Sequence, residues 1–306
     1  MTDNKHTVEQ IKALTEDILE YQSVDVEKAY TQLSRRMHKK QARHIFMHTL
    51  SRVAVILLLP LLISSVLFSY LYVKQKEQIE QVAYTQVSSA PGTITRLVLP
   101  DKSVAWLNSG STLSYPAVFS KKAREVKLSG EGYFEVESDP EHPFYVNTDD
   151  GIKVMAYGTK FNVNAYDDEP YIEAVLEKGK IDFISPEKTV RLEPERQAVF
   201  DKNTREITVS HISLDEKTGW KDGRLVFRNT PLDIVLKKLS KRYNVDIILH
   251  KNGNKEYRYR ATFTTETVGQ ILNYLKLTAP IEWSVKRPEQ NDDASFARQR
   301  IEVYLK

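Results

Sequence analysis

The longest uninterrupted apolar segment of the chain is Val53 to Val73, which holds 21 residues without a charge between Arg52 and Lys74. A helix rises ~1.5 Å per residue, so this segment has the length of a bilayer hydrocarbon core. A signal peptide would carry a shorter apolar run much nearer the N-terminus, and a buried core helix would be shorter as well. The pattern therefore predicts one transmembrane helix over 53–73.

Basic residues set the expected orientation of this helix. The 20 residues before it hold six lysines and arginines, whereas the 20 residues after it hold two. Positive charges remain on the cytoplasmic side, so we expect a single-pass protein of the inner membrane with a cytoplasmic N-terminus and a periplasmic C-terminus. The lipid bilayer is then one partner of the chain.

Residues 1–52 are predicted to form a cytoplasmic helical arm with two apolar stripes. Acidic side chains dominate residues 1–27, and the basic ones are concentrated in residues 28–52. So short an arm cannot bury both stripes well, and we expect a partner protein to cover them. Two alternatives are that the helices pack on each other and that the basic half contacts anionic lipid. The candidate contacts with a partner protein are Ile11, Leu14, Ile18, Val26, Tyr30 and Leu33.

Short strands with alternating apolar and polar residues are predicted over 93–212, after a polar linker over 74–92 that ends near a Pro-Gly break. Asp, Gly, Pro and Asn separate these strands and favour turns. This pattern indicates an antiparallel, sandwich-like all-β domain.

The final part, 213–306, changes to a mixed pattern. Thr230 is expected to cap a helix that Pro231 opens, and a second helix is expected from about Glu266. These elements indicate a compact α+β domain of order βαββαβ. The expected strands cover 225–227, 245–249, 257–263, 281–285 and 300–305.

Composition excludes several classes of protein. Of the 306 residues, 41% are hydrophobic and 28% are charged, which is typical of folded domains and not of disordered chains. The chain has no cysteine, which excludes disulfides, iron-sulfur clusters and thiol catalysis. A net charge of +3 is too small for a general polyanion binder, so we expect no direct contact with nucleic acid.

Motifs for catalysis or metal binding are nearly absent from the sequence. There is no Walker sequence, G-x-S-x-G elbow, H-E-x-x-H motif or dinucleotide fingerprint. His44 and His48 have the spacing of a metal-binding pair but no accompanying acid, and His142 lies in a turn of the usual solvated kind. We therefore expect no enzyme, no cofactor and no metal.

Three acids alternate along one predicted strand at Glu131, Glu135 and Glu137. Alternating acids usually mark the solvent side of a strand. They also resemble the paired carboxylates of a glycosidase, so a membrane-anchored envelope glycan hydrolase is an alternative function. A carbohydrate-binding anchor is a third possibility.

Four sequence blocks occur in a fixed order: L-P-D-x-S from Leu99, G-E-x-Y-F-E-V from Gly130, P-F-x-V from Pro143 and G-T-x-F-x-V from Gly158. Together with residues 220–247 they resemble the FecR-type transmembrane anti-sigma factors. The C-terminal domain is similar to that of the Bacteroidetes members, whose shape is related to the short N-terminal domain of secretins and TonB-dependent receptors.

This resemblance covers about residues 85–286 and departs from the family at two turns. Lys102 and Glu195 stand where the family usually has glycine. Both departures concern local turn geometry and not membership of the family.

The resemblance implies a function for each part. The arm would hold an extracytoplasmic-function sigma factor in the cytoplasm. The periplasmic part would receive a signal from the signalling domain of an outer-membrane TonB-dependent transducer. Regulated proteolysis by envelope proteases would then release the sigma factor.

The resemblance also singles out Gly158 and Thr159, because some members are cut at the equivalent Gly-Thr. A threonine hydroxyl can attack the preceding carbonyl where a strained turn presents it, and glycine permits such strain. The alternative is that Gly158 is a simple strand bulge.

The C-terminal domain is the expected receiver of the transducer signal. A small sheet leaves strand edges that a partner can extend by backbone hydrogen bonds. The predicted strand 257–263 places Tyr257 and Tyr259 on one face and Arg258 and Arg260 on the other, a composition common at binding hot spots. The alternative is that the tyrosine rings are core and the arginines are solvated.

Overall fold

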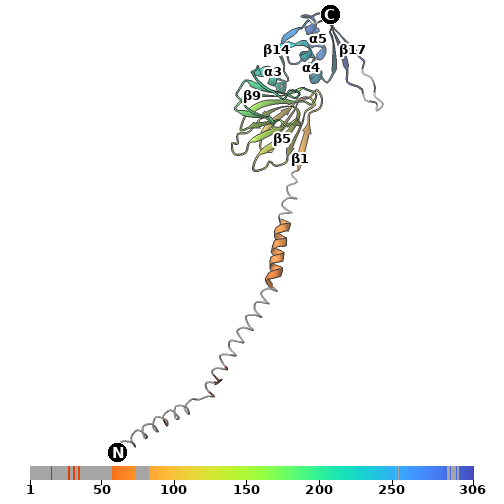
Figure 1. Ribbon diagram of the computed structural model, residues 1–306. Helices are drawn as coiled ribbons and strands as arrows, with labels where there is room; N and C mark the ends of the chain where they lie inside the picture. The colour runs from red at the N-terminus through yellow and green to blue at the C-terminus, as the bar shows by residue number, and fades with distance from the viewer. Residues whose placement is uncertain are drawn as a thin grey trace, which may run out of the picture. The chain divides into compact units, whose positions relative to one another are not determined.

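The computed structural model describes residues 57–72, 83–251, 253, 255–287, 290, 294 and 296–306, with isolated positions 15, 27, 30, 31 and 34. The chain divides into two compact units, Met1–Gln81 and Val82–Lys306. Figure 1 shows the elements of the second unit by label.

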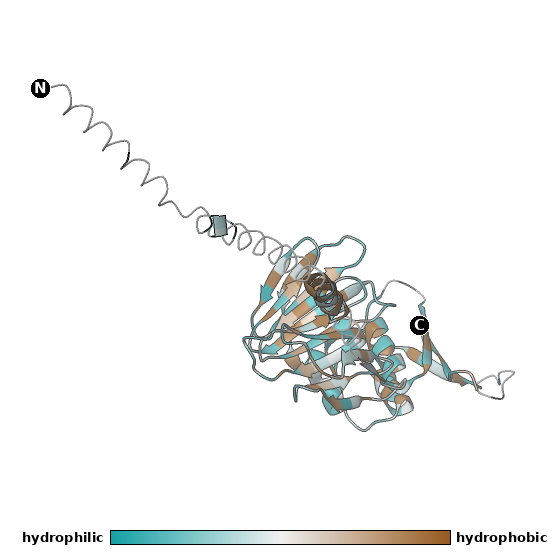
Figure 2. Cartoon of the chain, turned by 90° about the horizontal axis from the view of Figure 1, so that it is seen from below, coloured by the Kyte–Doolittle hydropathy of each residue, from teal (hydrophilic) through white to brown (hydrophobic). Residues whose placement is uncertain are grey.

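Residues 57–72 form a continuous helix of mostly apolar side chains, which is mostly brown in Figure 2. Its large apolar side chains are 51% to 73% exposed. Within the part of the chain that the structure describes, no helix reaches the length and apolarity needed to cross a membrane. Residues 53–56 and 73 of the expected span lie outside the described residues, so that span stays a prediction.

The β-domain, residues 84–211, confirms the predicted all-β region, and its described residues form one sheet of 13 strands. The strands are β1 (Tyr84–Ser88), β2 (Thr95–Val98), β3 (Val104–Leu107), β4 (Thr112–Pro116), β5 (Arg124–Glu135), β6 (Phe144–Asn147), β7 (Lys153–Ala156), β8 (Lys160–Ala165), β9 (Tyr171–Lys178), β10 (Ile181–Ile184), β11 (Thr189–Leu192), β12 (Arg196–Asp201) and β13 (Ile207–His211).

Strand β5 joins the two halves of this domain. Its first half pairs with β4 and β6, and its second half pairs with β3 and β8. The change of partners falls at Gly130, whose φ is +95°. A Cβ there would lie 2.8 Å from Ser111 Cα, so only glycine allows the strand to pass from one half to the other.

The core of the β-domain is apolar and fully enclosed. Alternate residues of β5 point inward, as the period of two in its sequence requires. The rings of Phe134 and Phe161 stack at a centroid distance of 5.3 Å, and Phe144 packs beside Phe134 at 6.1 Å. The burial of these rings, together with the other apolar side chains of the core, stabilises the domain.

The expected linker over 74–92 ends earlier than predicted, because residues 84–88 form β1. This strand pairs antiparallel with β4, with Val87 opposite Leu113. Val87 packs against the core of the β-domain. A short strand with only one inward apolar side chain gives little periodicity, so the polar residues around it read as linker.

The L-P-D-x-S block forms a charged corner at the turn between β2 and β3. Asp101 accepts hydrogen bonds from the backbone and side chain of Ser103 and pairs with buried Arg124 at 2.7 Å. Lys102 lies between them with a φ of +71°, and Glu195 has a φ of +64° at the second turn. The two departures from the family glycines therefore keep the left-handed backbone that glycine favours.

The C-terminal part contains strands at all five expected places, but the predicted order βαββαβ leaves out the last of them, 300–305. The order from β14 onward is βαββαββ, because β18 follows β17 and takes the centre of its own sheet. The elements are α3 (Leu214–Thr218), η1 (Gly219–Asp222), β14 (Leu225–Pro231), α4 (Leu232–Tyr243), β15 (Asp246–Lys251), β16 (Arg258–Phe263), α5 (Val268–Lys276), β17 (Ile281–Lys286) and β18 (Arg300–Leu305).

Two small sheets and two helices enclose a separate core in this C-terminal domain, residues 225–305. Strands β14 and β16 pair with each other, and β18 lies between β15 and β17. Helix α5 starts with a capping box between Thr267 and Gln270. Thr230 does not cap α4 as expected, because Pro231 occupies the N-cap position and the Thr230 hydroxyl donates to Glu216.

Candidate functional site

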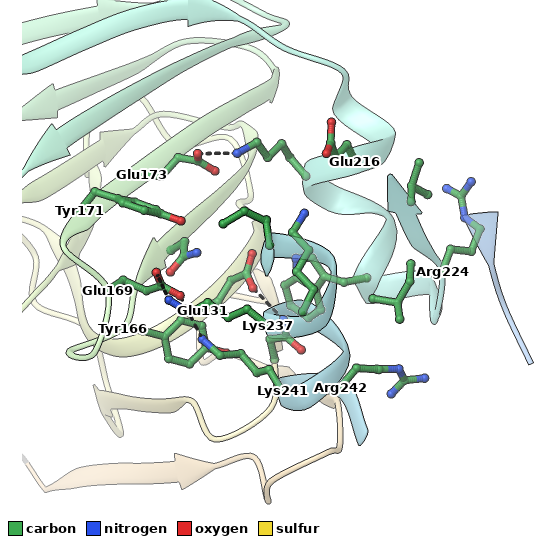
Figure 3. A pocket seen from close by; sticks show the side chains of 18 residues that line it. Glu131, Tyr166, Glu169, Tyr171, Glu173, Glu216, Arg224, Lys237, Lys241 and Arg242 are labelled. Carbon is green, nitrogen blue, oxygen red and sulfur yellow. Dashed lines mark hydrogen bonds and ion pairs between the residues drawn. The ribbon is translucent and has the colours of Figure 1, made fainter. Parts of the chain in front are cut away.

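Polar side chains form a row across the outer face of β5, β8 and β9. The strand register places Glu131 beside Asn164, and Asn164 beside Glu173. Successive residues of a strand point to opposite faces, so Val163 enters the core while its neighbour Asn164 points away from it. Segments α3, η1 and α4 cover the row (Figure 3).

Glu131 is held by two amides. Asn108 Nδ2 donates to it at 2.7 Å, and Asn162 Nδ2 donates to it at 2.9 Å. Burial raises the pKa of the Glu131 carboxyl, although the two amide hydrogen bonds oppose the shift. Asn162 in turn accepts a hydrogen bond from Trp220 Nε1 at 3.1 Å, so one chain of contacts runs from β5 to η1.

Lysines of the helices approach this row from the opposite side. Lys237 and Lys241 stand one turn apart on α4 and both reach Glu169, at N···O distances of 2.6 and 3.6 Å. The Lys241 ammonium lies 3.1 Å from the centroid of the Tyr166 ring. Figure 3 shows these lysines directed at the loop before β9. The charges of the two sides are complementary, and contacts of this kind fix the helix position.

A cavity of about 120 Å³ lies at this contact. Lys238 lines it and makes no hydrogen bond or ion pair with any described residue, and burial lowers the pKa of its ammonium. The buried Oδ1 of Asn164 also has no hydrogen-bond partner among those residues. We call the whole contact the seam, made of Glu131, Asn162, Asn164, Glu169 and Glu173 on the β-domain and Lys217, Trp220, Lys237, Lys238 and Lys241 opposite them.

Comparison with known families decides the identity of the chain. The model of FecR protein matches residues 85–182, and the model of the FecR C-terminal domain matches residues 224–290. The two matched regions together make up more than half of the chain. The chain belongs to the FecR family of anti-sigma factors.

Solved structures agree with this assignment. Two crystal structures of a candidate anti-sigma factor from Parabacteroides distasonis ATCC 8503, at 2.50 and 1.65 Å, resemble the FecR chain at 27% and 28% identity. Their TM-scores are 0.62 and 0.63, and they cover 73% and 72% of this chain and 100% and 99% of their own. No curated protein matches the chain. The FecR chain therefore has the fold of these structures over nearly three quarters of its length.

The expected sigma-binding residues fall almost wholly outside the described part of the FecR chain. Tyr30 is described, and it is helical and 73% exposed. The remaining five, Ile11, Leu14, Ile18, Val26 and Leu33, lie outside the described residues, as do His44 and His48. Their roles stay predictions.

The expected self-cleavage position lies in the tight turn before β8. Gly158 has a φ of +118°, and a Cβ there would lie 2.8 Å from Ser138. The Thr159 hydroxyl is buried and has no hydrogen-bond partner among the described residues. The irregular register between β8 and β9 falls later, between Lys160 and Phe161. The turn is thus one that requires glycine, which both the self-cleavage and the bulge interpretations accept.

The candidate transducer contacts divide by face, as the sequence alternation predicts. Tyr259 is 7% exposed and belongs to the C-terminal core, whereas Arg258 and Arg260 are exposed. Tyr257 is partly buried and packs against the same core. Tyr259 therefore fits the alternative of a core ring, whereas Tyr257 keeps part of its surface exposed, and the transducer-binding roles of these residues stay predictions.

The three alternating acids do not share a solvent face as expected. Glu131 belongs to the seam, Glu135 pairs with Lys160 at 3.0 Å, and Glu137 is exposed beyond the end of β5. The expectation was wrong for Glu131 because a distant helix covers that part of the strand. His142 is paired with Asp139 at 2.8 Å, and this hydrogen bond lowers the pKa of Asp139.

Sequence reasoning missed the seam. Lys237, Lys238 and Lys241 recur at i, i+1 and i+4 on α4, which is also the pattern of an ordinary solvated helix face. Only their position opposite Glu169 gives them a role. The one signal in the sequence was Trp220. This large ring lies between the two domains and fits the apolar pattern of neither.

Proposed function

We propose that this FecR chain is a single-pass inner-membrane regulator whose N-terminal arm binds an extracytoplasmic-function sigma factor. The observation that supports it is the order of the parts. The two matched FecR regions follow a 21-residue uncharged segment, which itself follows an arm with two apolar stripes and a basic second half. An arm on the opposite side of a bilayer from the FecR regions is suited to controlling transcription by binding, because one helix forms no pore.

A pull-down of the sigma factor by the full-length chain tests this function. Leu33→Asp places a charge in an apolar stripe, and a charge cannot enter a desolvated interface without a large penalty. The matched control is Gln32→Asp, which adds the same charge one residue away from the stripe. We expect Leu33→Asp to lose the sigma factor and Gln32→Asp to retain it. Equal retention by both variants contradicts the proposed role of the arm.

The C-terminal domain is proposed to receive the signal from the signalling domain of a TonB-dependent transducer. Support comes from its strand edges: β16 pairs only with β14, and β15 and β17 each pair only with β18 among the described strands. Free edges bind an added strand through backbone hydrogen bonds. Hydrogen exchange of the full chain with this signalling domain is expected to show protection within 225–305. Protection confined to 84–211 would mean that the receiver is misplaced.

Regulated proteolysis is the proposed route of release, and self-cleavage at Gly158-Thr159 is one way it could begin. The Thr159 hydroxyl would attack the Gly158 carbonyl and form an ester as the amide nitrogen takes the proton, and water would then cleave the ester into two chains. The hypothesis predicts two fragment masses, merged into one by Thr159→Ala. A single intact chain in both the parent and Thr159→Ala means that self-cleavage does not occur here.

A further inference from the structure

The seam differs from the two cores that it separates. The apolar clusters of the β-domain and the C-terminal domain share no buried residue among those described. The contacts between them include ion pairs, side-chain hydrogen bonds and the cation–π contact of Lys241 with the Tyr166 ring, and Trp220 lies among them. Polar interfaces between domains permit relative motion far more readily than apolar ones. The C-terminal domain is therefore held in place mainly by charge.

The docked seam also holds two polar groups that make no hydrogen bond or ion pair with a described residue, although the half-buried Lys238 ammonium lies 5.8 Å from the Phe227 ring of its own domain. Lys238 faces Glu131 of β5, Glu173 of β9 and both Glu216 and Lys217 of α3, but none of them lies within bonding distance of its ammonium. Asn164 Oδ1 is buried without a hydrogen bond. A buried polar atom without a partner is costly, and water would bond to Asn164 Oδ1 if the seam opened. Opening would also rehydrate the Lys238 ammonium, which burial disfavours, so both groups oppose the favourable ion pairs.

We propose that the seam is a reversible latch, in which α4 and Trp220 hold the C-terminal domain on the outer face of β5, β8 and β9 until the contact opens. Its use in signalling rests on the proposed function, because a receiver domain must pass its state to the β-domain. The opening itself needs neither a sigma factor nor a transducer. A failed sigma pull-down and a failed latch test therefore mean different things.

The three tryptophans of the chain give one reporter for each region. Trp106 lies in the β-domain, Trp220 in the seam and Trp283 in the C-terminal domain. The Trp220 indole N–H is bonded across the seam to Asn162, whereas the Trp283 indole N–H is bonded to Asn273 within its own domain, both at 3.1 Å. Hydrogen exchange of these two indole signals, followed by NMR in the full chain, separates opening of the seam from unfolding.

Two substitutions on α4 are expected to move the latch in opposite directions. Lys237→Glu repels Glu169, and we expect about threefold faster exchange of the Trp220 indole, the scale of one partly exposed ion pair. Lys238→Met replaces a partly desolvated cation that forms no ion pair by an apolar chain of similar length, so exchange should slow. Lys121→Glu, an exposed charge reversal away from the seam, is the matched control and should change nothing. In every variant the Trp283 indole should exchange at the same rate as in the parent chain.

A disulfide across the seam gives an independent test in this cysteine-free chain. A Cβ on Gly92 would lie 3.2 Å from Asn244 Cβ, about 0.6 Å shorter than the ~3.8 Å typical of a disulfide. In ~1 M salt, where the screening length is about 3 Å, the ion pairs of the seam should weaken and the Trp220 indole of the parent chain should exchange faster. The oxidised Gly92→Cys/Asn244→Cys chain should not show this faster exchange. Reduction should restore it.

Two results would overturn the latch. Exchange of the Trp220 indole that is unchanged by both Lys237→Glu and salt means that charge does not hold the seam. A salt response that persists in the oxidised double-cysteine chain means that the indole is exposed by another motion.

Discussion

The interior of the β-domain and the seam are both buried, but different forces hold them. In the interior, Phe134 and Phe161 are fully enclosed and need only apolar neighbours of suitable shape. In the seam, Glu169 is stabilised by Lys237 and Lys241, and removing one charge leaves another unpaired. Packing in the interior therefore depends little on ionic strength, whereas the ion pairs of the seam are expected to weaken as salt is added.

The largest expected effect is in the interior. Phe161→Ala should lower the free energy of unfolding by ~3–5 kcal/mol, because it removes a stacked ring and leaves a cavity. Chemical denaturation of the full chain measures this loss. Tyr157→Ala, at a ring that is 40% exposed, is the matched control and should cost less than about 1 kcal/mol. Equal losses from the two variants would remove the distinction between core and surface on which the comparison rests.

A smaller effect is expected in the seam. Glu169→Gln leaves two lysines without their carboxylate, and since Lys237 is 44% exposed we expect a loss of only ~1 kcal/mol. Unlike the loss at Phe161, this one should shrink as salt is added. Glu187→Gln breaks an exposed pair with Arg205 and should be neutral. A loss that does not depend on salt would show that the seam is held by packing.

Two carboxyls should give stability opposite dependences on pH. Hydrogen bonds from His250 and Arg300 lower the pKa of the Glu302 carboxyl below its value of about 4.5 in the unfolded chain. The stability that Glu302 contributes is therefore present above that unfolded pKa and is lost as pH falls through the lowered pKa. Burial raises the pKa of the Glu131 carboxyl. The contribution of Glu131 to folding stability is therefore largest at low pH and is lost as pH rises through the raised pKa. In a plot of melting temperature against pH, Glu302→Gln should lose the fall in stability at low pH. Glu131→Gln should lose the fall in stability as pH rises. A parallel shift of the curve in either variant would contradict the assigned direction.

The smallest expected effect lies at the turns. Lys102→Gly and Glu195→Gly relieve a left-handed backbone at exposed positions, and each should stabilise the chain by up to ~1 kcal/mol. Lys102→Ala keeps the unfavourable φ and should give no gain. Thermal unfolding of the three variants measures the differences, and a loss of stability in Lys102→Gly would mean that the lysine side chain contributes to the corner around Asp101.

Most of the regular structure could be predicted because it follows from local alternation. The inward residues of β5, the apolar face of α4 and the two faces of β16 all follow from the period of two or of 3.6. Strand β1 was missed because one inward Val87 gives no period. The central place of β18 in its sheet was equally hidden, since strand order depends on contacts between residues far apart in the chain.

By itself, the sequence determined the all-β and α+β domains, their order behind the apolar segment, and the family to which the chain belongs. Only the tertiary structure decided what the charged residues do. Alternation places Glu131 outside the core, but an outer face becomes solvent or interface according to what folds over it. Lys238 comes to lie near Glu131 although 107 positions separate them in the chain. No local pattern records such a meeting, because Coulomb and hydrogen-bond energies depend on distances in space and on the water that folding excludes.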